Sequence, residues 1–297
     1  MSAVISTIIV NYNAGDFLRH CVDSLLNCPL EIEIIVVDNA STDGSLDALS
    51  RMPEVQIIKN PRNVGFAAAC NTGARVASAP FLFFLNPDCY FNPGTLASLL
   101  EAMCLDERVG MAGGLLTNPD GSEQAGGRRA VPTPWRSFVR AFGLARFADR
   151  WPRLFYDFHL HKQPLPAQPI EVEAISGACM LVKREAMQDV GEWDEGYFLH
   201  CEDLDWCMRF RQKGWKILFV PSAQITHALG VCSKGRPVFV EWHKHKGMIR
   251  FYHKFFRHQY PGALMALVSV GVWLRFGLVV TRLTAKRVGR ALGLGRD

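Results

Sequence analysis

Short runs of apolar, mostly β-branched residues recur through the first 85 positions, and segments with helical character lie between them. The runs occupy residues 4–10, 32–37, 55–58 and 81–85. The segment from Phe17 to Leu26 carries its apolar residues at helical spacing. Buried strands that alternate with helices predict an α/β fold with a mostly parallel central sheet flanked by helices on both faces.

Polar residues follow three of these runs directly. They are the tripeptides Asn11-Tyr12-Asn13, Asp38-Asn39-Ala40 and Asn86-Pro87-Asp88. The carboxyl ends of parallel strands lie at one edge of a sheet, and ligands of such sheets bind at that edge. We therefore expect a ligand site where these tripeptides meet.

Two common phosphate-binding motifs are missing. The sequence contains no GxxxxGK[ST], and no GxGxxG follows a strand-like run. Their absence argues against a P-loop hydrolase and an ordinary dinucleotide oxidoreductase.

The second half of the chain is less regular. We expect a strand over 109–116 and a loop over 117–134, and eight aromatic residues lie among basic ones over 135–160. Regular structure should resume over 172–183, followed by a helix from 184 and another to about 213. A strand near 216–220 leads to His227.

Six sequence blocks together resemble a known enzyme family. They are IIVNYN (8–13), VVDNASTDGS (36–45), NPRNVGFAAACNTG (60–73), FLNPDC (84–89), the segment SGACM…RQKGW (176–215) and ITHALGVCSKG (225–235). In this order they resemble the family 2 inverting glycosyltransferases with the GT-A nucleotide-diphospho-sugar transferase fold. The resemblance is greatest to bacterial dTDP-rhamnosyltransferases of cell-surface polysaccharides, and it covers about residues 4–260.

The resemblance implies a nucleoside pocket around Asp38, which would accept hydrogen bonds from the base or the ribose. Asn11, Tyr12 and Asn39 would line the same pocket. The alternative is that this tripeptide only forms a turn, with Ser41 or Thr42 as a helix cap.

Two further segments are expected near the donor. In the NVGFAAACNTG block we assign Asn63, Gly65 and Asn71 to nucleotide-sugar binding, with Gly65 permitting close approach of the backbone to the nucleotide. The alternative is tight packing of a helix alone. The resemblance also places Ser176 and Gly177 beneath the donor sugar.

The family's DxD metal motif corresponds here to Asn86-Pro87-Asp88. Its carboxylates hold a divalent cation that neutralises the diphosphate leaving group. Asn86 is a neutral and weaker ligand, so Asp88 would be the main anionic one, with His227 as the third ligand and Mg²⁺ or Mn²⁺ as the ion. Lys234 and Arg236 would close over the diphosphate and compensate for the missing acid.

The acidic pair Glu202-Asp203 matches the family's ED motif. This match puts Asp203 in the position of the general base and leaves Glu202 as the alternative base. An inverting transfer is one displacement, in which the acceptor hydroxyl loses its proton as the new bond forms. A carboxylate also stabilises oxocarbenium-like charge. The alternative is a set of acids that favour a helix N-terminus, a role we expect for Asp205. Trp193 would stack on a sugar or lie in the core.

The charge of the chain is divided unevenly. Residues 234–297 contain 13 basic and 2 acidic residues, a net +11, whereas residues 1–233 contain 20 and 26, a net −6. We therefore divide the chain into a GT-A catalytic domain (1–233) and a basic amphipathic segment (234–297) for membrane association.

Two helices are expected in the basic segment, over 242–258 and 263–290. Residues 262–281 are long enough to span a bilayer, but Arg275 lies near their middle. Arg275, Arg282, Lys286 and Arg290 share one face, which favours a helix along an anionic membrane surface. A homodimer contact and a nucleic-acid arm are less favoured alternatives.

The nine cysteines form no CxxC pair, and the N-terminus lacks the features of a signal peptide. We expect a cytoplasmic enzyme, peripheral to the inner face of a membrane, with a nucleotide-sugar donor and a glycan or lipid-linked acceptor. L-Rhamnose from dTDP-rhamnose is the favoured donor sugar. A UDP-hexose donor and a non-catalytic nucleotide-sugar-binding scaffold of a glycan assembly complex remain alternatives.

Overall fold

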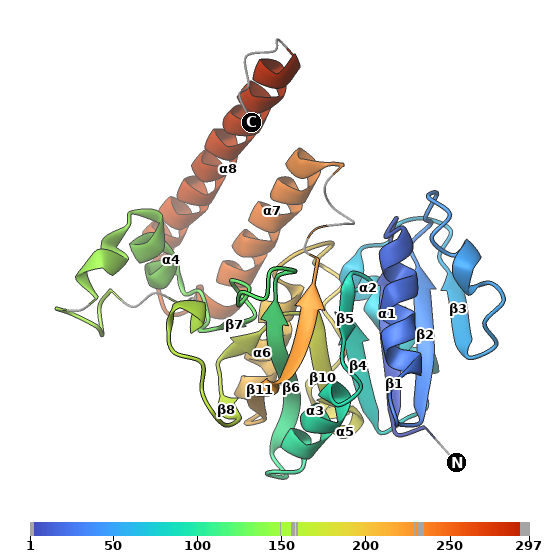
Figure 1. The fold of residues 1–297 in the computed structure, drawn as a ribbon. Helices are drawn as coiled ribbons and strands as arrows, with labels where there is room; N and C mark the ends of the chain where they lie inside the picture. Colours follow the sequence, from blue (N-terminus) through green and yellow to red (C-terminus); the bar gives the residue numbers. More distant parts are fainter. Residues whose placement is uncertain are drawn as a thin grey trace.

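The computed structural model describes residues 3–148, 150–155, 158, 160–228, 230 and 235–291, with one large sheet at its centre (Figure 1). Its strands are β1 (Ile5–Asn11), β2 (Ile32–Asp38), β3 (Val55–Lys59), β4 (Phe81–Leu85), β5 (Cys89–Phe91), β6 (Val109–Thr117), β8 (Ile170–Glu171), β10 (Cys179–Lys183) and β11 (Lys216–His227). A small second sheet pairs β7 (Arg128–Arg129) with β9 (Ala174–Ile175).

Helices cover both faces of the large sheet (Figure 1). They are α1 (Asp16–Leu26), α2 (Phe66–Val76), α3 (Thr95–Met103), α4 (Pro134–Ala141), α5 (Arg184–Val190), α6 (Glu202–Gln212), α7 (Pro237–Phe256) and α8 (Gly262–Ala291), with short 3-10 turns η1 (Asp47–Leu49), η2 (Leu144–Phe147) and η3 (Leu160–Lys162). Apolar residues of α1 and α3 form the core on one face, and those of α2, α5, α6 and α7 form the core on the other. The predicted α/β architecture is confirmed.

The first half of the sheet is parallel, in the order β3-β2-β1-β4. All seven residues of β1 are buried, which explains why its sequence shows no alternation of apolar and charged residues. Asn11 pairs in register with Asp38, and Ile9 pairs with Leu85. The polar tripeptides predicted at the strand ends therefore lie along one edge.

The second half follows in the order β10-β6-β11-β5, with β10 antiparallel to both β4 and β6. The regular structure expected over 172–183 is broken at Ser176-Gly177-Ala178, which separates β9 from β10. The strand expected near 216–220 is longer than predicted and continues to His227, where it pairs with Cys89 of β5. His227 is thereby held directly beside the segment that follows β4.

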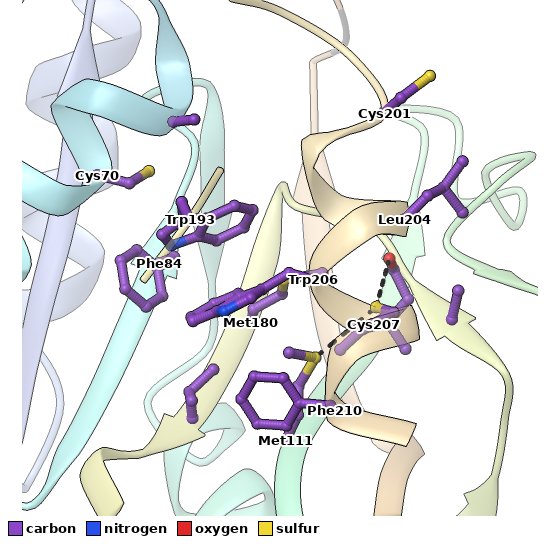
Figure 2. Close-up of a cluster of buried hydrophobic side chains, with 14 of the residues drawn as sticks. Cys70, Phe84, Met111, Met180, Trp193, Cys201, Leu204, Trp206, Cys207 and Phe210 are labelled. Atoms are coloured by element: carbon purple, nitrogen blue, oxygen red, sulfur yellow. Dashed lines mark hydrogen bonds between the residues drawn. The ribbon is translucent and has the colours of Figure 1, made fainter. Parts of the chain in front are cut away.

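An aromatic cluster joins α6 to the sheet (Figure 2). Trp193 and Trp206 lie with ring centroids 4.2 Å apart, and each contacts Phe84 edge-on at 5.3 Å. Trp193 is buried, so of its two expected roles the structure supports the core position. Burying rings of this size contributes a large share of the local packing energy and fixes the start of α6 over the sheet.

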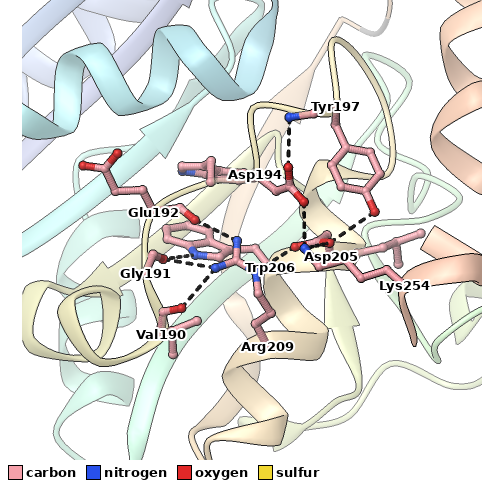
Figure 3. Close-up of polar contacts among 12 residues, drawn as sticks. Val190, Gly191, Glu192, Asp194, Tyr197, Asp205, Trp206, Arg209 and Lys254 are labelled. Atoms are coloured by element: carbon pink, nitrogen blue, oxygen red, sulfur yellow. Dashed lines mark hydrogen bonds and ion pairs between the residues drawn. The ribbon is translucent and has the colours of Figure 1, made fainter. Parts of the chain in front are cut away.

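Helix α7 packs on this body through an ionic network centred on the buried Asp205 (Figure 3). Lys254 contacts Asp205 at 2.6 Å and Asp194 at 2.7 Å, and Arg250 bonds Asp194 at 2.9 Å. Asp205 is fully buried and also accepts hydrogen bonds from Tyr197 and Arg209. Asp205 is therefore part of an ion network and not merely an acid at a helix start, and this network ties α7 to the body that carries the large sheet.

Gly65, which precedes α2, has a left-handed backbone with φ of 91°, and a Cβ there would lie 2.7 Å from the Phe198 carbonyl oxygen. We expect Gly65→Ala to lower the free energy of unfolding by about 2 kcal/mol or more, because strain and clash add. Gly126→Ala is the matched control, since Gly126 has φ of 93° but open space around it. Chemical denaturation of both variants measures the difference, and equal losses would contradict the role of the Phe198 contact.

Candidate active site at the carboxyl edge of the sheet

The expected nucleoside pocket begins at the ends of β1 and β2. Asn11 is buried and donates from Nδ2 to Asp38 Oδ1 at 2.8 Å, and it also contacts the Ser41 and Ser45 hydroxyls. Asp38 accepts a second bond from the Ser41 amide at 3.0 Å. Tyr12 lies half-buried at the same strand end. The Asn11–Asp38 pair fixes the carboxylate at the edge of the sheet, as predicted from the tripeptides.

Asn39 and Asn63 organise the loop that enters α2. Asn39 donates to the Gly65 carbonyl at 3.2 Å, and Asn63 accepts from the Gly65 amide at 2.9 Å. The close approach that Gly65 permits is to the backbone of Phe198, whose carbonyl oxygen accepts from the Phe66 amide at 2.8 Å. This contact with Phe198 accounts for the glycine at position 65, and a contact of Gly65 with the nucleotide stays a prediction.

Asn71 has a structural task in α2. Its Nδ2 donates to the Trp193 carbonyl and to Glu195, and its Oδ1 accepts from the Trp193 amide at 3.0 Å. Both amide hydrogens are therefore used inside the protein, and Asn71 is 1% exposed. The structure gives Asn71 the role of holding residues 193–195 against α2, which differs from the contact with a nucleotide that we predicted.

Asp88 and His227 meet at the end of β4. Both are buried, and Asp88 Oδ1 lies 3.2 Å from His227 Nε2. Gln124 determines which nitrogen of His227 carries the proton. Its Nε2 donates to Asn118 and to the His227 carbonyl, so its Oε1 accepts from His227 Nδ1–H at 2.7 Å. With the proton on Nδ1, His227 Nε2 accepts from Asn86 Nδ2 at 3.3 Å, and Asp88 Oδ1 lies beside it.

This arrangement fits a divalent cation. His227 Nε2 and Asp88 Oδ1 lie 3.2 Å apart, so either a proton on Nε2 or a bound cation would hold the nitrogen and the carboxylate together. Asn86 Nδ2 lies 3.3 Å from His227 Nε2, and the amide oxygen of Asn86 is its atom that would bind a cation. Cys89 is within the same cluster, but burial first and the Asp88 charge second raise the pKa of its thiol well above the usual range. Asp88, His227 and Asn86 are thus the residues suited to hold a metal.

Asp203 lies at the first turn of α6 and is only 13% exposed through its side chain. Its Oδ2 forms an ion pair with Arg129 of β7 and accepts from the Gly177 amide at 3.2 Å. His200 and Cys201, which precede α6, have φ of 68° and 71°, values that non-glycine residues rarely adopt. This strained entry directs the start of α6 toward the edge of the sheet, and such strain is common at functional sites.

Glu202 differs sharply from its neighbour Asp203. It is buried, and its Oε2 has no hydrogen-bond partner among the described residues. Burial first, and repulsion from the Asp203 charge second, raise the pKa of Glu202 from 4.5 to about 8. Glu202 is therefore mostly a neutral acid at pH 7, whereas Asp203 has an arginine partner and a backbone donor.

Residues 176–178 connect the two halves of the site. The Gly177 amide bonds Asp203, and one residue later the Ala178 carbonyl accepts from the Asn86 amide at 3.0 Å. Ser176 donates its amide to the Gly127 carbonyl, next to Arg128 and Arg129. This three-residue segment therefore brings the acid at the start of α6 close to the Asn86–Asp88–His227 group.

The two predicted diphosphate contacts come from the segment before α7. Lys234 lies outside the described residues, and Arg236 is exposed at the start of α7. Two residues that the sequence did not single out are instead part of the site. Gln124 orients His227 and Arg129 pairs with Asp203, and both come from the segment expected to be a loop. Their signal was weak, because neither side chain lies in a recognised motif.

Comparison with known proteins identifies the family. Residues 6–191 match the family described as glycosyl transferase family 2, and residues 126–281 match glycosyl transferase family group 2. The chain belongs to glycosyltransferase family 2. It is 32% identical over 240 residues to an N-acetylglucosaminyl-diphospho-decaprenol L-rhamnosyltransferase of Mycobacterium tuberculosis, with 76% of each chain covered.

More distant relatives of this glycosyltransferase agree on the fold. A pre-mycofactocin glycosyltransferase of Mycobacterium tuberculosis is 25% identical over 97% of this chain and 58% of its own length. The mannosyltransferase PcManGT from Pyrobaculum calidifontis, solved with GDP-Man and Mn²⁺, has a TM-score of 0.58 at 17% identity, covering 100% of this chain and 77% of that one. GalNAc-T7, solved with UDP, GalNAc and Mn²⁺, has a TM-score of 0.56 at 20% identity, covering 76% and 44%. The glycosyltransferase therefore has the predicted GT-A fold.

The contact between Gln124 and His227 gives a prediction of its own. Gln124→Leu removes the acceptor for His227 Nδ1–H, and we expect the affinity of the glycosyltransferase for Mn²⁺ to fall by about 10- to 100-fold, the usual effect of losing such a partner of a histidine ligand. Gln124→Glu keeps an acceptor oxygen and should restore part of the loss. Isothermal titration with Mn²⁺ measures both, and unchanged affinity in the leucine variant would show that His227 is oriented by other contacts.

Proposed function

We propose that this glycosyltransferase transfers L-rhamnose from dTDP-rhamnose to a hydroxyl group of a lipid-linked glycan, with inversion at the anomeric carbon. The observation that carries the proposal is the connection, through residues 176–178, of a carboxylate at the start of α6 with the Asn86–Asp88–His227 group at the end of β4. The choice of rhamnose and of a lipid-linked acceptor rests on the 32% identity to the mycobacterial L-rhamnosyltransferase.

Each residue has a separate role in the proposed displacement. Asp38 and Asn11 hold the nucleoside at the ends of β1 and β2, with Tyr12 and Asn39 beside them. Ser176 and Gly177 lie beneath the donor sugar. Asp203 accepts the proton of the acceptor hydroxyl as its oxygen bonds to the anomeric carbon, and the bond to the nucleoside diphosphate breaks on the opposite face. Arg129 and the Gly177 amide orient the carboxylate of Asp203 for this step.

Asp88 and His227 would hold Mg²⁺ or Mn²⁺ together with Asn86. Such an ion neutralises the charge that develops on the departing diphosphate. With only one carboxylate among the three ligands, we propose that Arg236 and Lys234 add positive charge at the same end of the donor. Arg236→Ala should then weaken donor binding, and unchanged donor affinity would exclude this contact.

A screen of donor hydrolysis tests the proposed reaction. The full chain is incubated with dTDP-rhamnose, other dTDP-sugars and UDP-hexoses, each with and without Mn²⁺ or Mg²⁺. Cation-dependent turnover of dTDP-rhamnose in preference to the others is expected. Preference for a UDP-hexose would replace the donor but keep the chemistry, an alternative favoured by the UDP in one structural neighbour. Binding without turnover of any donor would favour a nucleotide-sugar-binding scaffold.

We also propose that α8 attaches the enzyme to the inner, cytoplasmic face of a membrane. Residues Gly262–Val288 are long and apolar enough to cross a bilayer, and only 11% of their most apolar window is buried. The leucines at 264, 267, 274 and 278 form an exposed stripe on α8, and Arg275 and Arg282 lie beside it. High salt should release the enzyme from anionic vesicles if α8 lies along the surface, whereas retention in high salt would indicate a spanning helix.

A further inference from the structure

A second exposed apolar surface lies outside both the active site and the C-terminal helices. We call it the aromatic arm and define it as the described residues of 134–154, which include α4 and η2. Its large side chains face solvent, among them Phe142 (65% exposed), Trp151 (47%), Phe138, Trp135 and Phe147. Trp135 stacks on Phe138 with centroids 5.5 Å apart, and Phe138 lies 4.5 Å from Phe142. These three rings therefore form one continuous apolar patch.

The exposed rings are carried by an anchored helix. Thr133 caps α4 by accepting from the Arg136 amide, and Val139 is fully buried. Ser137 bonds Tyr252 of α7 at 2.7 Å, and Arg136 pairs with Glu173 at 2.7 Å. Helix α4 is thus fixed to the body on one side while its rings point away on the other.

The arm also carries excess positive charge. Residues 134–154 contain five arginines and one acidic residue, Asp149. Arg146 lies over the ring of Phe147 at 4.9 Å, and Arg150 lies over that of Trp151 at 5.2 Å. Aromatic rings mixed with arginines are typical of surfaces that enter the headgroup region of an anionic membrane.

The aromatic arm lies next to the start of α8. Trp135, Arg136, Arg153 and Leu154 line a groove of about 690 Å³ together with Tyr260, which lies in the turn between α7 and α8. Figure 1 shows α4 beside the first turns of α8, on the side of the molecule that carries both C-terminal helices. Two exposed apolar elements with basic residues are therefore neighbours.

We propose that the aromatic arm is a second membrane-contact element, which inserts its rings among the headgroups of an anionic bilayer beside α8. This inference extends the proposed membrane attachment, but it does not depend on the donor or on the reaction. Two separate contacts on one side of the molecule fix its orientation, since a single helix leaves rotation about its own axis free. The arm would then hold the active site in a constant orientation relative to a lipid-linked acceptor in the membrane.

The test uses the full chain and vesicles of phosphatidylcholine with or without phosphatidylglycerol. The variant Phe142→Ser with Trp151→Ser removes the two most exposed rings of the arm. Leu105→Ser with Val76→Ser is the matched control, because these side chains are similarly exposed but lie elsewhere. We expect the arm variant to bind anionic vesicles about tenfold more weakly and the control to bind normally, since membrane binding scales with the apolar area inserted.

A dominant contribution from α8 is separated in two ways. First, the arm substitutions are added to a chain that already carries Leu267→Ser and Leu274→Ser in α8. In that weakened background, the arm substitutions should remove most of the vesicle binding that remains. Hydrogen exchange of the original chain provides a second readout, in which anionic vesicles should protect the amides of residues 134–148. This protection is expected whether α8 spans the bilayer or lies on it.

Two outcomes would overturn the proposal. One is unchanged vesicle binding of the arm variant in both backgrounds together with no protection of the arm. The other is that the arm variant converts a dimer into a monomer in sedimentation without affecting vesicle binding, which would assign the surface to a second copy of the chain. Donor hydrolysis without vesicles should be equal in all variants, so a failure of the proposed reaction is recognised independently.

Discussion

Asp203→Asn should reduce the rate of glycosyl transfer by about 10²- to 10⁴-fold, the usual contribution of a general base. The amide has nearly the same shape as the carboxylate, but it does not take the proton of the acceptor hydroxyl. It also loses the charge that pairs with Arg129. Nucleotide affinity should stay close to that of the original enzyme, because Asp203 belongs to α6 and the proposed nucleoside pocket lies at the ends of β1 and β2. Initial rates and nucleotide titration measure the two effects separately.

Glu202→Gln is the control that the structure offers for this prediction. Glu202 is adjacent, but its raised pKa makes it mostly neutral at pH 7, so a neutral glutamine should preserve most of the activity. Stability gives a second readout. Between pH 4.5 and about 8 the folded state keeps a proton that the unfolded state releases, so the free energy of unfolding should fall as pH rises through this range. The glutamine variant should lack that fall.

Two results would contradict these roles. Full transfer activity in Asp203→Asn would exclude Asp203 as the base. Loss of activity in Glu202→Gln with normal activity in the Asp203 variant would exchange the roles of the two acids.

Asp88→Asn should have the second large effect, on metal-dependent activity. Asp88 is the one carboxylate among the three predicted ligands, so its replacement leaves only neutral donors at Asn86, residue 88 and His227. We expect the affinity for Mn²⁺ to fall by at least about 100-fold, since hard divalent cations depend strongly on anionic oxygen ligands. Titration of activity with Mn²⁺ and direct calorimetry measure the loss.

Asp120→Asn is a suitable control for Asp88→Asn, because Asp120 is an exposed acid of the loop after β6. Its replacement should leave the cation dependence unchanged. If Asp88→Asn kept both its Mn²⁺ affinity and its activity, the metal would have to bind elsewhere or be unnecessary, and the proposed role of His227 would fail with it.

The sequence predicted the parts of the site that follow from local patterns. Asn11, Asp38 and Asn86 come directly after apolar runs, with Asp88 two residues later, and the rule that parallel strands end at one edge was enough to place them along that edge. The contact of Asp88 with His227 required the family resemblance, because 138 residues lie between the two and no local pattern joins them.

Other parts of the site could not be predicted because they depend on distant contacts. Strand β10 lies antiparallel between β4 and β6. The local sequence of a strand does not determine which strands it pairs with, so this position could not be predicted. Arg129 acquires its partner only when the short pairing of β7 with β9 is formed. Likewise, the sequence indicated that Gly65 permits a close backbone approach. It could not show that the neighbour is Phe198, which lies 133 residues further along the chain.

The ionic network beneath α7 bears on how a lipid-free form of the enzyme should be prepared. Shortening the chain at the end of the GT-A segment predicted from charge would remove Lys254 and leave the buried Asp205 with only Arg209 and Tyr197 as partners, so we expect such a chain to be less stable. A shortened enzyme that ends within the turn after Phe256 keeps Lys254 and Arg250 and discards α8. Without α8 the protein should be recovered in the soluble fraction after lysis in high salt without detergent, because only the aromatic arm remains to contact a membrane.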